Sequence, residues 1–166
     1  MVTSRMRYLF AVCITSLALL AQDNQYKKYR GAWFEISYPA NFRVIPSLQS
    51  RGMPDEFDSV FFESPDKQVR FYIFSPQWGG DTPDIALKDT QETHHLDKRE
   101  DKGGFRKVWY TIRPKKTGRT RSYLETTNDE GNIRWVIGIE YTNREAYTKH
   151  LPQYEKFKAS LRQFAD

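Results

Sequence analysis

The sequence predicts an α+β domain with a central antiparallel β-sheet of about six strands, flanked by helices on both faces, and with a C-terminal helix docked on the sheet. Three observations support this fold class. Short aromatic-rich segments alternate between apolar and polar positions and are separated by Pro and Gly turns. Their connections are too short for the crossovers of a parallel sheet. Several segments carry large apolar residues on both faces, so both faces need cover.

Six segments have the length and pattern of strands: residues 33–38, 59–63, 68–75, 106–113, 120–127 and 133–141. The first segment ends at Pro39, which cannot donate a hydrogen bond to a sheet ladder. The last segment has the strongest pattern, because Trp135, Ile137 and Ile139 fall on one face.

Two helices are expected. Thr82 is a favourable N-cap and Pro83 suits the first helical position, which predicts a helix from about Pro83 to Leu96. Pro152 is expected to open the second helix, whose apolar residues recur along one face: Tyr154, Phe157, Leu161 and Phe164. This apolar stripe is expected to pack on the strand 133–141 and to cover Trp135, Ile137 and Ile139.

The segment Phe34–Phe42 (FEISYPANF) resembles the start of PsbP-like and DcrB-like domains, and Phe62–Pro65 and Phe157–Phe164 resemble later parts of them. The resemblance follows the element order of the whole mature chain. It implies an antiparallel sheet flanked by helices and closed by a terminal helix. That superfamily includes photosynthetic extrinsic proteins and bacterial envelope proteins, with no shared catalytic residue to transfer to this chain.

Residues 1–21 have the pattern of an export signal. Arg5 and Arg7 precede an apolar run that ends at Ala21, and this run is shorter than the roughly 20 residues that span a bilayer. Cleavage there leaves residues 22–166 as one domain. Cys13, the single cysteine of the chain, lies inside the signal. Val12 precedes it in place of a small residue, which argues against a lipoprotein.

The expected setting is the bacterial periplasm or the medium outside the cell. Exported eukaryotic domains usually carry disulfides, and the mature chain has no cysteine to form one. We expect no transmembrane segment in the mature chain. The formal net charge of +5 falls by two, to +3, when Arg5 and Arg7 are removed. Because this charge is small, no nucleic-acid partner is expected.

No catalytic, cofactor-binding or metal-binding residue is indicated. The chain has no Gly-x-Ser-x-Gly motif, and its Gly-Gly pairs lack the strand-to-helix context of a phosphate-binding loop. His94 and His95 are adjacent, so on the expected helix they would point about 100° apart and could not hold one ion together. We expect no enzyme and no cofactor. The alternative that stays open is a small hydrolase or metal-dependent enzyme with a scattered site.

Positive charge is concentrated at one expected hairpin tip, in five residues: Arg113, Lys115, Lys116, Arg119 and Arg121. Such a tip can contact an envelope protein or an anionic surface component such as lipid headgroups or a polyanionic glycan. Charged hairpin tips also keep sheet edges soluble without any partner, so both interpretations stay open. Trp33 and Trp78 are further candidate contacts, although aromatic residues more often pack in a core. The sequence therefore predicts an exported non-catalytic accessory or binding module of the bacterial cell envelope.

Overall fold

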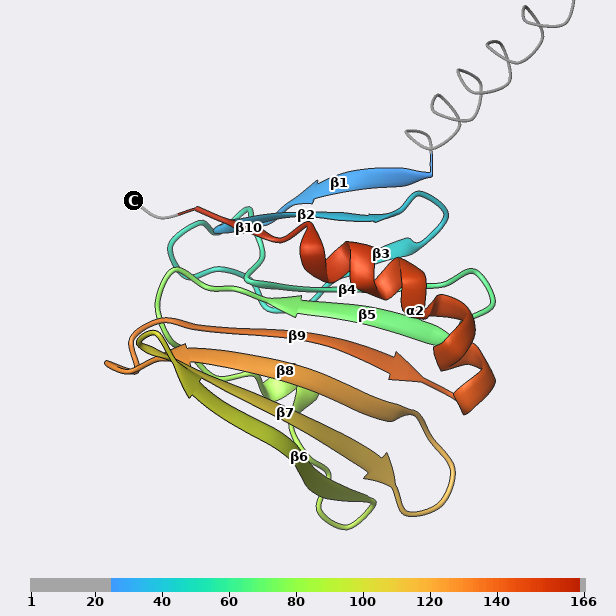
Figure 1. Ribbon diagram of the computed structural model, residues 1–166. Coiled ribbons are helices and arrows are strands. Elements are labelled where there is room, and N and C mark those ends of the chain that lie inside the picture. The colour runs from blue at the N-terminus through green and yellow to red at the C-terminus, as the bar shows by residue number, and fades with distance from the viewer. Residues whose placement is uncertain (1–24, 165–166) are drawn as a thin grey trace, which may run out of the picture.

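The computed structural model describes residues 25–164, so the expected export signal lies outside the described residues. The described part contains ten strands, one α-helix and one 3-10 turn, and the strands form two antiparallel sheets (Figure 1). The prediction of an α+β domain, with about six strands flanked by helices on both faces, is therefore wrong, because the described residues are mostly β-strand. All six expected strands are present, but four others join them, and one α-helix is found where two were expected.

The larger sheet has seven strands, and every neighbouring pair is antiparallel. Their spatial order is β3 (Arg43–Pro46), β4 (Ser59–Glu63), β5 (Val69–Phe74), β9 (Arg134–Tyr141), β8 (Thr120–Asn128), β7 (Phe105–Pro114) and β6 (Glu92–Lys102). Hairpin connections join β3 to β4, β4 to β5, β6 to β7, β7 to β8 and β8 to β9, whereas the long segment 75–91 leads from β5 to β6 at the far edge of the sheet. Strand β9 then pairs between β5 and β8. The expected antiparallel pairing is thus confirmed.

One face of this sheet is covered by helix α2 (Arg144–Ala159) together with a three-stranded sheet (Figure 1). The small sheet has the order β1 (Tyr26–Arg30), β2 (Phe34–Pro39) and β10 (Arg162–Gln163). Phe157 on α2 is fully buried, with its ring 5.4 Å from that of Phe62 and 5.2 Å from that of Phe71. These three rings form the centre of the core between the layers.

The expected docking of the terminal helix on the strand 133–141 holds in part. Ile137 and Ile139 belong to the same buried cluster as the helix residue Tyr154. Trp135 lies outside this cluster and its ring contacts that of Phe105 at 5.8 Å. The helix also begins earlier than expected, because the Asn143 side chain accepts a hydrogen bond from the backbone of residue 146, and Pro152 falls inside α2. No helix in residues 25–164 has the length and apolar character needed to cross a membrane.

The opposite face is covered by the irregular segment 75–91, which contains the 3-10 turn η1 (Pro83–Ile85). The predicted helix 83–96 is wrong, because the chain leaves the turn after Ile85 and pairs with β7 as strand β6 from Glu92. Ile85 is the only buried residue between positions 83 and 96. A favourable N-cap cannot sustain a helix without an apolar face to bury, and Thr82 makes no side-chain cap hydrogen bond.

Antiparallel pairing gathers the connecting loops at two ends of the molecule (Figure 1). One end carries the β4–β5 turn, the β7–β8 loop and the start of α2, on the right of Figure 1. The other end carries the loops 47–58 and 75–82 and the β8–β9 turn. The expected basic tip lies at the first end, which we call the basic end.

Candidate functional site

The structure separates the five predicted basic residues into two groups. Arg113, near the end of β7, and Lys115 and Lys116, on the β7–β8 loop, are exposed. Arg119 is half-buried and Arg121 is 8% exposed. The five side chains therefore do not form one continuous charged surface.

Arg121 is committed to internal contacts. Its guanidinium donates hydrogen bonds to the carbonyl oxygens of Ile85 at 3.0 Å and Ala86 at 3.2 Å, and it forms an ion pair with Glu92. These contacts tie β8 to β6 and to the segment that covers the second face. Because its charge is neutralised by a carboxylate that is itself largely buried, Arg121 is a structural residue.

Arg119 is also held inside the fold. It donates to the Lys67 carbonyl oxygen, and its Nη2 atom lies 3.7 Å from the Glu63 carboxylate. Glu63 is 4% exposed and receives further hydrogen bonds from Arg43 at 2.7 Å and Arg70 at 3.0 Å. Burial opposes ionisation of Glu63, but the hydrogen bond from Arg43 and the nearby guanidinium charges outweigh it and hold the pKa of this carboxyl below its ordinary value.

These ion pairs belong to a row of charges that crosses five neighbouring strands. The strand register places side chains of alternating sign next to one another in the order Arg43, Glu63, Arg70, Glu140 and Arg121. Opposite charges facing each other across strands stabilise a sheet by roughly 0.2–1 kcal/mol per pair. The hydroxyl of Tyr123 donates to Glu140 at 3.0 Å and completes the row. This charge row holds the base of the β7–β8 loop in place.

The tip of the loop presents charge to solvent. Within residues 25–164, no acidic side chain lies at ion-pair distance from Arg113, Lys115 or Lys116. Lys115 donates to the Asp89 carbonyl oxygen at 2.8 Å, which braces the tip against the end of the 75–91 segment. We call these three residues the basic tip. It combines three unneutralised positive charges with a base fixed by buried ion pairs.

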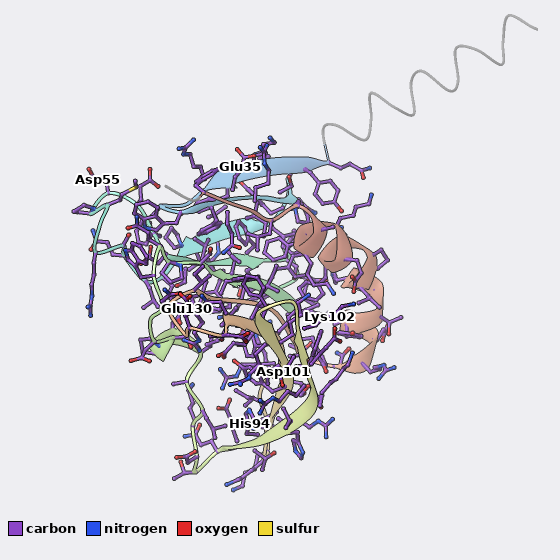
Figure 2. The ribbon with its side chains drawn as sticks, turned by 60° about the vertical axis from the view of Figure 1, so that its left-hand side comes forward. Glu35, Asp55, His94, Asp101, Lys102 and Glu130 are labelled. Atoms are coloured by element: carbon purple, nitrogen blue, oxygen red, sulfur yellow. The ribbon has the colours of Figure 1, made fainter. Side chains whose placement is uncertain are left out.

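The histidines do not gather into a metal site in the part of the chain that the structure describes, where no three His, Cys, Asp or Glu side chains converge. His94 and His95 lie on β6 rather than on a helix, so they point to opposite faces of the sheet. The His94 ring packs 5.1 Å from that of Tyr110. Figure 2 shows His94 near one end of β6, with Asp101 and Lys102 near the other.

A groove lies at the opposite end of the sheets from the basic tip. It has a volume of about 820 Å³, and both Trp33 and Trp78 line it. These two residues were candidate contacts in the sequence, but nothing in the sequence placed them together. The charge row was missed too, because its members become neighbours only through the strand register.

No protein-family model matches the chain, and no curated protein matches it. Among solved structures, it is similar to the solution structure of cyanobacterial PsbP (CyanoP) from Synechocystis sp. PCC 6803, with 12% sequence identity and a TM-score of 0.50. The similarity covers 85% of this chain and 94% of that chain. The chain has a PsbP-like fold. The predicted fold-level resemblance is thereby confirmed, and at this identity the PsbP-like fold is all that the similarity shows.

A crystal structure from Bacteroides thetaiotaomicron VPI-5482 is also similar, with 16% identity and a TM-score of 0.49. That similarity covers 86% of this chain but only 50% of the other.

Proposed function

We propose that the protein is an exported, non-catalytic binding module of the bacterial cell envelope, and that its basic tip contacts an anionic component there. The observation that carries the proposal is a contrast in charge: the positive charges at the base of the loop are neutralised by carboxylates, and those of the basic tip are not. Arg119 and Arg121 form ion pairs inside the fold. The side chains of the basic tip, Arg113, Lys115 and Lys116, are exposed to solvent. The PsbP-like fold, found in an extrinsic class of proteins, fits an accessory role.

A fixed base favours binding for a physical reason. Association costs conformational entropy when a flexible loop must become ordered, and a loop that is already held by buried contacts avoids much of that cost. A basic side chain near an anionic membrane surface contributes about 1 kcal/mol, so three such side chains change affinity by about 100-fold. The partner is an anionic surface: lipid headgroups, a polyanionic glycan or an acidic protein face.

The test compares two triple variants of the chain without residues 1–21. The first is Arg113→Ser/Lys115→Ser/Lys116→Ser. The matched control removes the same charge from three exposed lysines outside the loop: Lys27, Lys102 and Lys107. Binding to anionic vesicles and to a polyanionic glycan is measured as salt rises.

We expect the tip variant to lose about 100-fold in affinity for one of these anions. The control variant should keep most of the affinity. Both variants should unfold within about 0.5 kcal/mol of the parent, because the substituted residues are exposed and outside the core. Equal losses in the two variants would show that net charge alone drives binding. A parent protein without salt-sensitive anion binding would contradict the proposed role of the tip.

A further inference from the structure

The groove at the end of the sheets opposite the basic tip has the features of a preformed ligand site. It lies between the segments 48–52 and 76–83 and has a volume of about 820 Å³. Figure 2 shows Asp55, on the loop 47–58, and Glu130, on the β8–β9 turn, on this same side of the molecule. Ligand pockets of small domains are commonly of about this size, roughly 300–1,000 Å³.

Aromatic rings line the groove. Phe74 is 3% exposed, whereas Trp78 is 63% exposed. Trp33 is half-buried, and its indole N–H donates to the Ser50 hydroxyl at 3.3 Å, which fixes the orientation of the ring. The exposed Trp78 indole and the oriented Trp33 indole line the same groove, so both are available to contact a ligand there.

Carboxylates also line the groove, from Asp58 and Asp81. The Oδ1 atom of Asp58 is buried and accepts no hydrogen bond within the described residues. Burial raises the pKa of Asp58, and a hydrogen bond from Ser50 only partly opposes this effect. A buried carboxylate oxygen without a donor is costly, and a positive charge held nearby in the groove offsets part of that cost electrostatically. The one basic residue of the lining is Arg51, and its side chain is exposed.

The wall that carries Trp78 and Asp81 is held rigidly. Arg134 donates two hydrogen bonds to Glu125, at 2.9 and 3.0 Å, and also donates to the Gly80 carbonyl oxygen. Glu125 is the ion-pair partner of Arg134, and Asp81 adds only a weaker attraction to the same guanidinium, so Asp81 forms no ion pair within the described residues. The Gly79 N–H donates to the Asn132 carbonyl oxygen at 2.6 Å, so the loop is fastened to the β8–β9 turn at a second point.

We propose that this groove binds an alkylammonium group, with the Trp33 and Trp78 rings against its apolar, positively charged surface and the Asp58 and Asp81 carboxylates as its counter-charges. Aromatic faces attract organic cations, most strongly when water is excluded, and Trp is the best of the aromatic side chains for this contact. The group can belong to a free quaternary amine or to a lysine side chain of a partner protein. The groove is independent of the anionic contact proposed for the basic tip.

The experiment uses calorimetric titration of the exported chain with three probes. Choline represents a free quaternary amine, and Nα-acetyl-lysine methylamide represents a lysine side chain. 3,3-Dimethylbutanol has nearly the shape of choline without its charge. We expect one or both cations to bind saturably and the neutral alcohol to bind at least about tenfold more weakly, which corresponds to roughly 1.4 kcal/mol. Choline alone would identify a free amine, and binding of the lysine derivative would identify a protein side chain.

Variants locate the binding in the groove. Trp78→Ala and Asp81→Asn change exposed residues and should each weaken cation binding about tenfold. Asp58→Asn should weaken it further, and its unfolding midpoint shows whether the fold is retained. The matched control is Asp55→Asn, which removes the same charge from the exposed tip of the same loop and should change affinity less than twofold. Equal binding of the neutral alcohol, unchanged affinity in both exposed-site variants, or the absence of saturable cation binding would overturn the proposal.

Discussion

Replacing Glu63 with Gln tests the charge row at its most enclosed point. Glu63 is 4% exposed, and its two carboxylate oxygens receive Arg43 at 2.7 Å and Arg70 at 3.0 Å. Arg119, from the β7–β8 loop, lies 3.7 Å away. Gln keeps the shape of the side chain but removes the charge, and its amide NH₂ group must face a guanidinium. The substitution therefore removes a counter-charge shared by three arginines, of which Arg70 keeps a second carboxylate, that of Glu140 at 3.9 Å.

The expected loss of stability is set by how buried each partner is. Removing one member of a fully buried ion pair costs about 3–5 kcal/mol. Here the Arg43 and Arg70 side chains are 68% and 34% exposed, so water compensates them in part, whereas Arg119 is 19% exposed. We expect Glu63→Gln to lower the free energy of unfolding by about 2–3 kcal/mol near pH 7, close to the cost of losing charge-assisted hydrogen bonds. That is a large fraction of the roughly 5–15 kcal/mol typical of a domain.

The pH dependence of this loss has a defined sign. The folded protein holds the pKa of Glu63 below its ordinary value, so the ionised form stabilises the fold. The stabilisation is fully present above the ordinary glutamate pKa of about 4.3 and is lost as the pH falls through the lowered folded pKa. Urea unfolding of the parent and of Glu63→Gln, followed by circular dichroism across this range, should show the difference shrinking toward low pH.

The control for this experiment is Glu130→Gln on the exposed β8–β9 turn, which should change stability by less than about 0.5 kcal/mol. A Glu63→Gln variant as stable as the parent at pH 7 would refute the structural role given to the charge row. A difference that stays constant down to pH 3 would show that the loss has a cause other than the carboxylate charge.

Three further outcomes are expected. Phe157→Ala should lower the free energy of unfolding by about 3–5 kcal/mol, since the ring is fully buried; an unchanged urea midpoint would mean that α2 does not dock as described. Asn143→Ala should cost about 0.5–2 kcal/mol, because the side chain accepts the Ala146 N–H at 2.8 Å, and Asn143→Ser should restore most of it. Intact-mass measurement on exported protein should find a new N-terminus near Gln22, and retention of Met1 would contradict the export signal.

The strands could be predicted from the sequence where the pattern of period two was strong and bounded by turn residues. Residues 59–63 and 133–141 are examples, and both are found close to their expected positions. Strand β6 was missed because its residues are charged and its only apolar side chain, Leu96, is 62% exposed. This edge strand is held by backbone hydrogen bonds to β7. Because backbone pairing does not require apolar side chains, it produces no alternating apolar pattern in the sequence.

For the candidate site, the sequence predicted basic residues at a hairpin tip. It could not show which of them are exposed and which form ion pairs inside the fold. What separates the roles of Arg119 and Arg121 from those of Lys115 and Lys116 is which residues lie opposite them in space. Their partners, Glu63 and Glu92, come from strands far away along the chain. No local pattern carries that information.

By itself, the sequence determined the antiparallel hairpins, six of the strands and the concentration of positive charge near residue 115. These are local properties, because alternation, turn residues and charge density act over a few neighbouring positions. Only the tertiary structure decided that Thr82 starts a single turn instead of a helix, that Arg121 is neutralised, and that Trp33 and Trp78 share a groove. The physical reason is that each of these depends on register and layer packing, which bring residues together from separate strands and cannot be derived from their order along the chain.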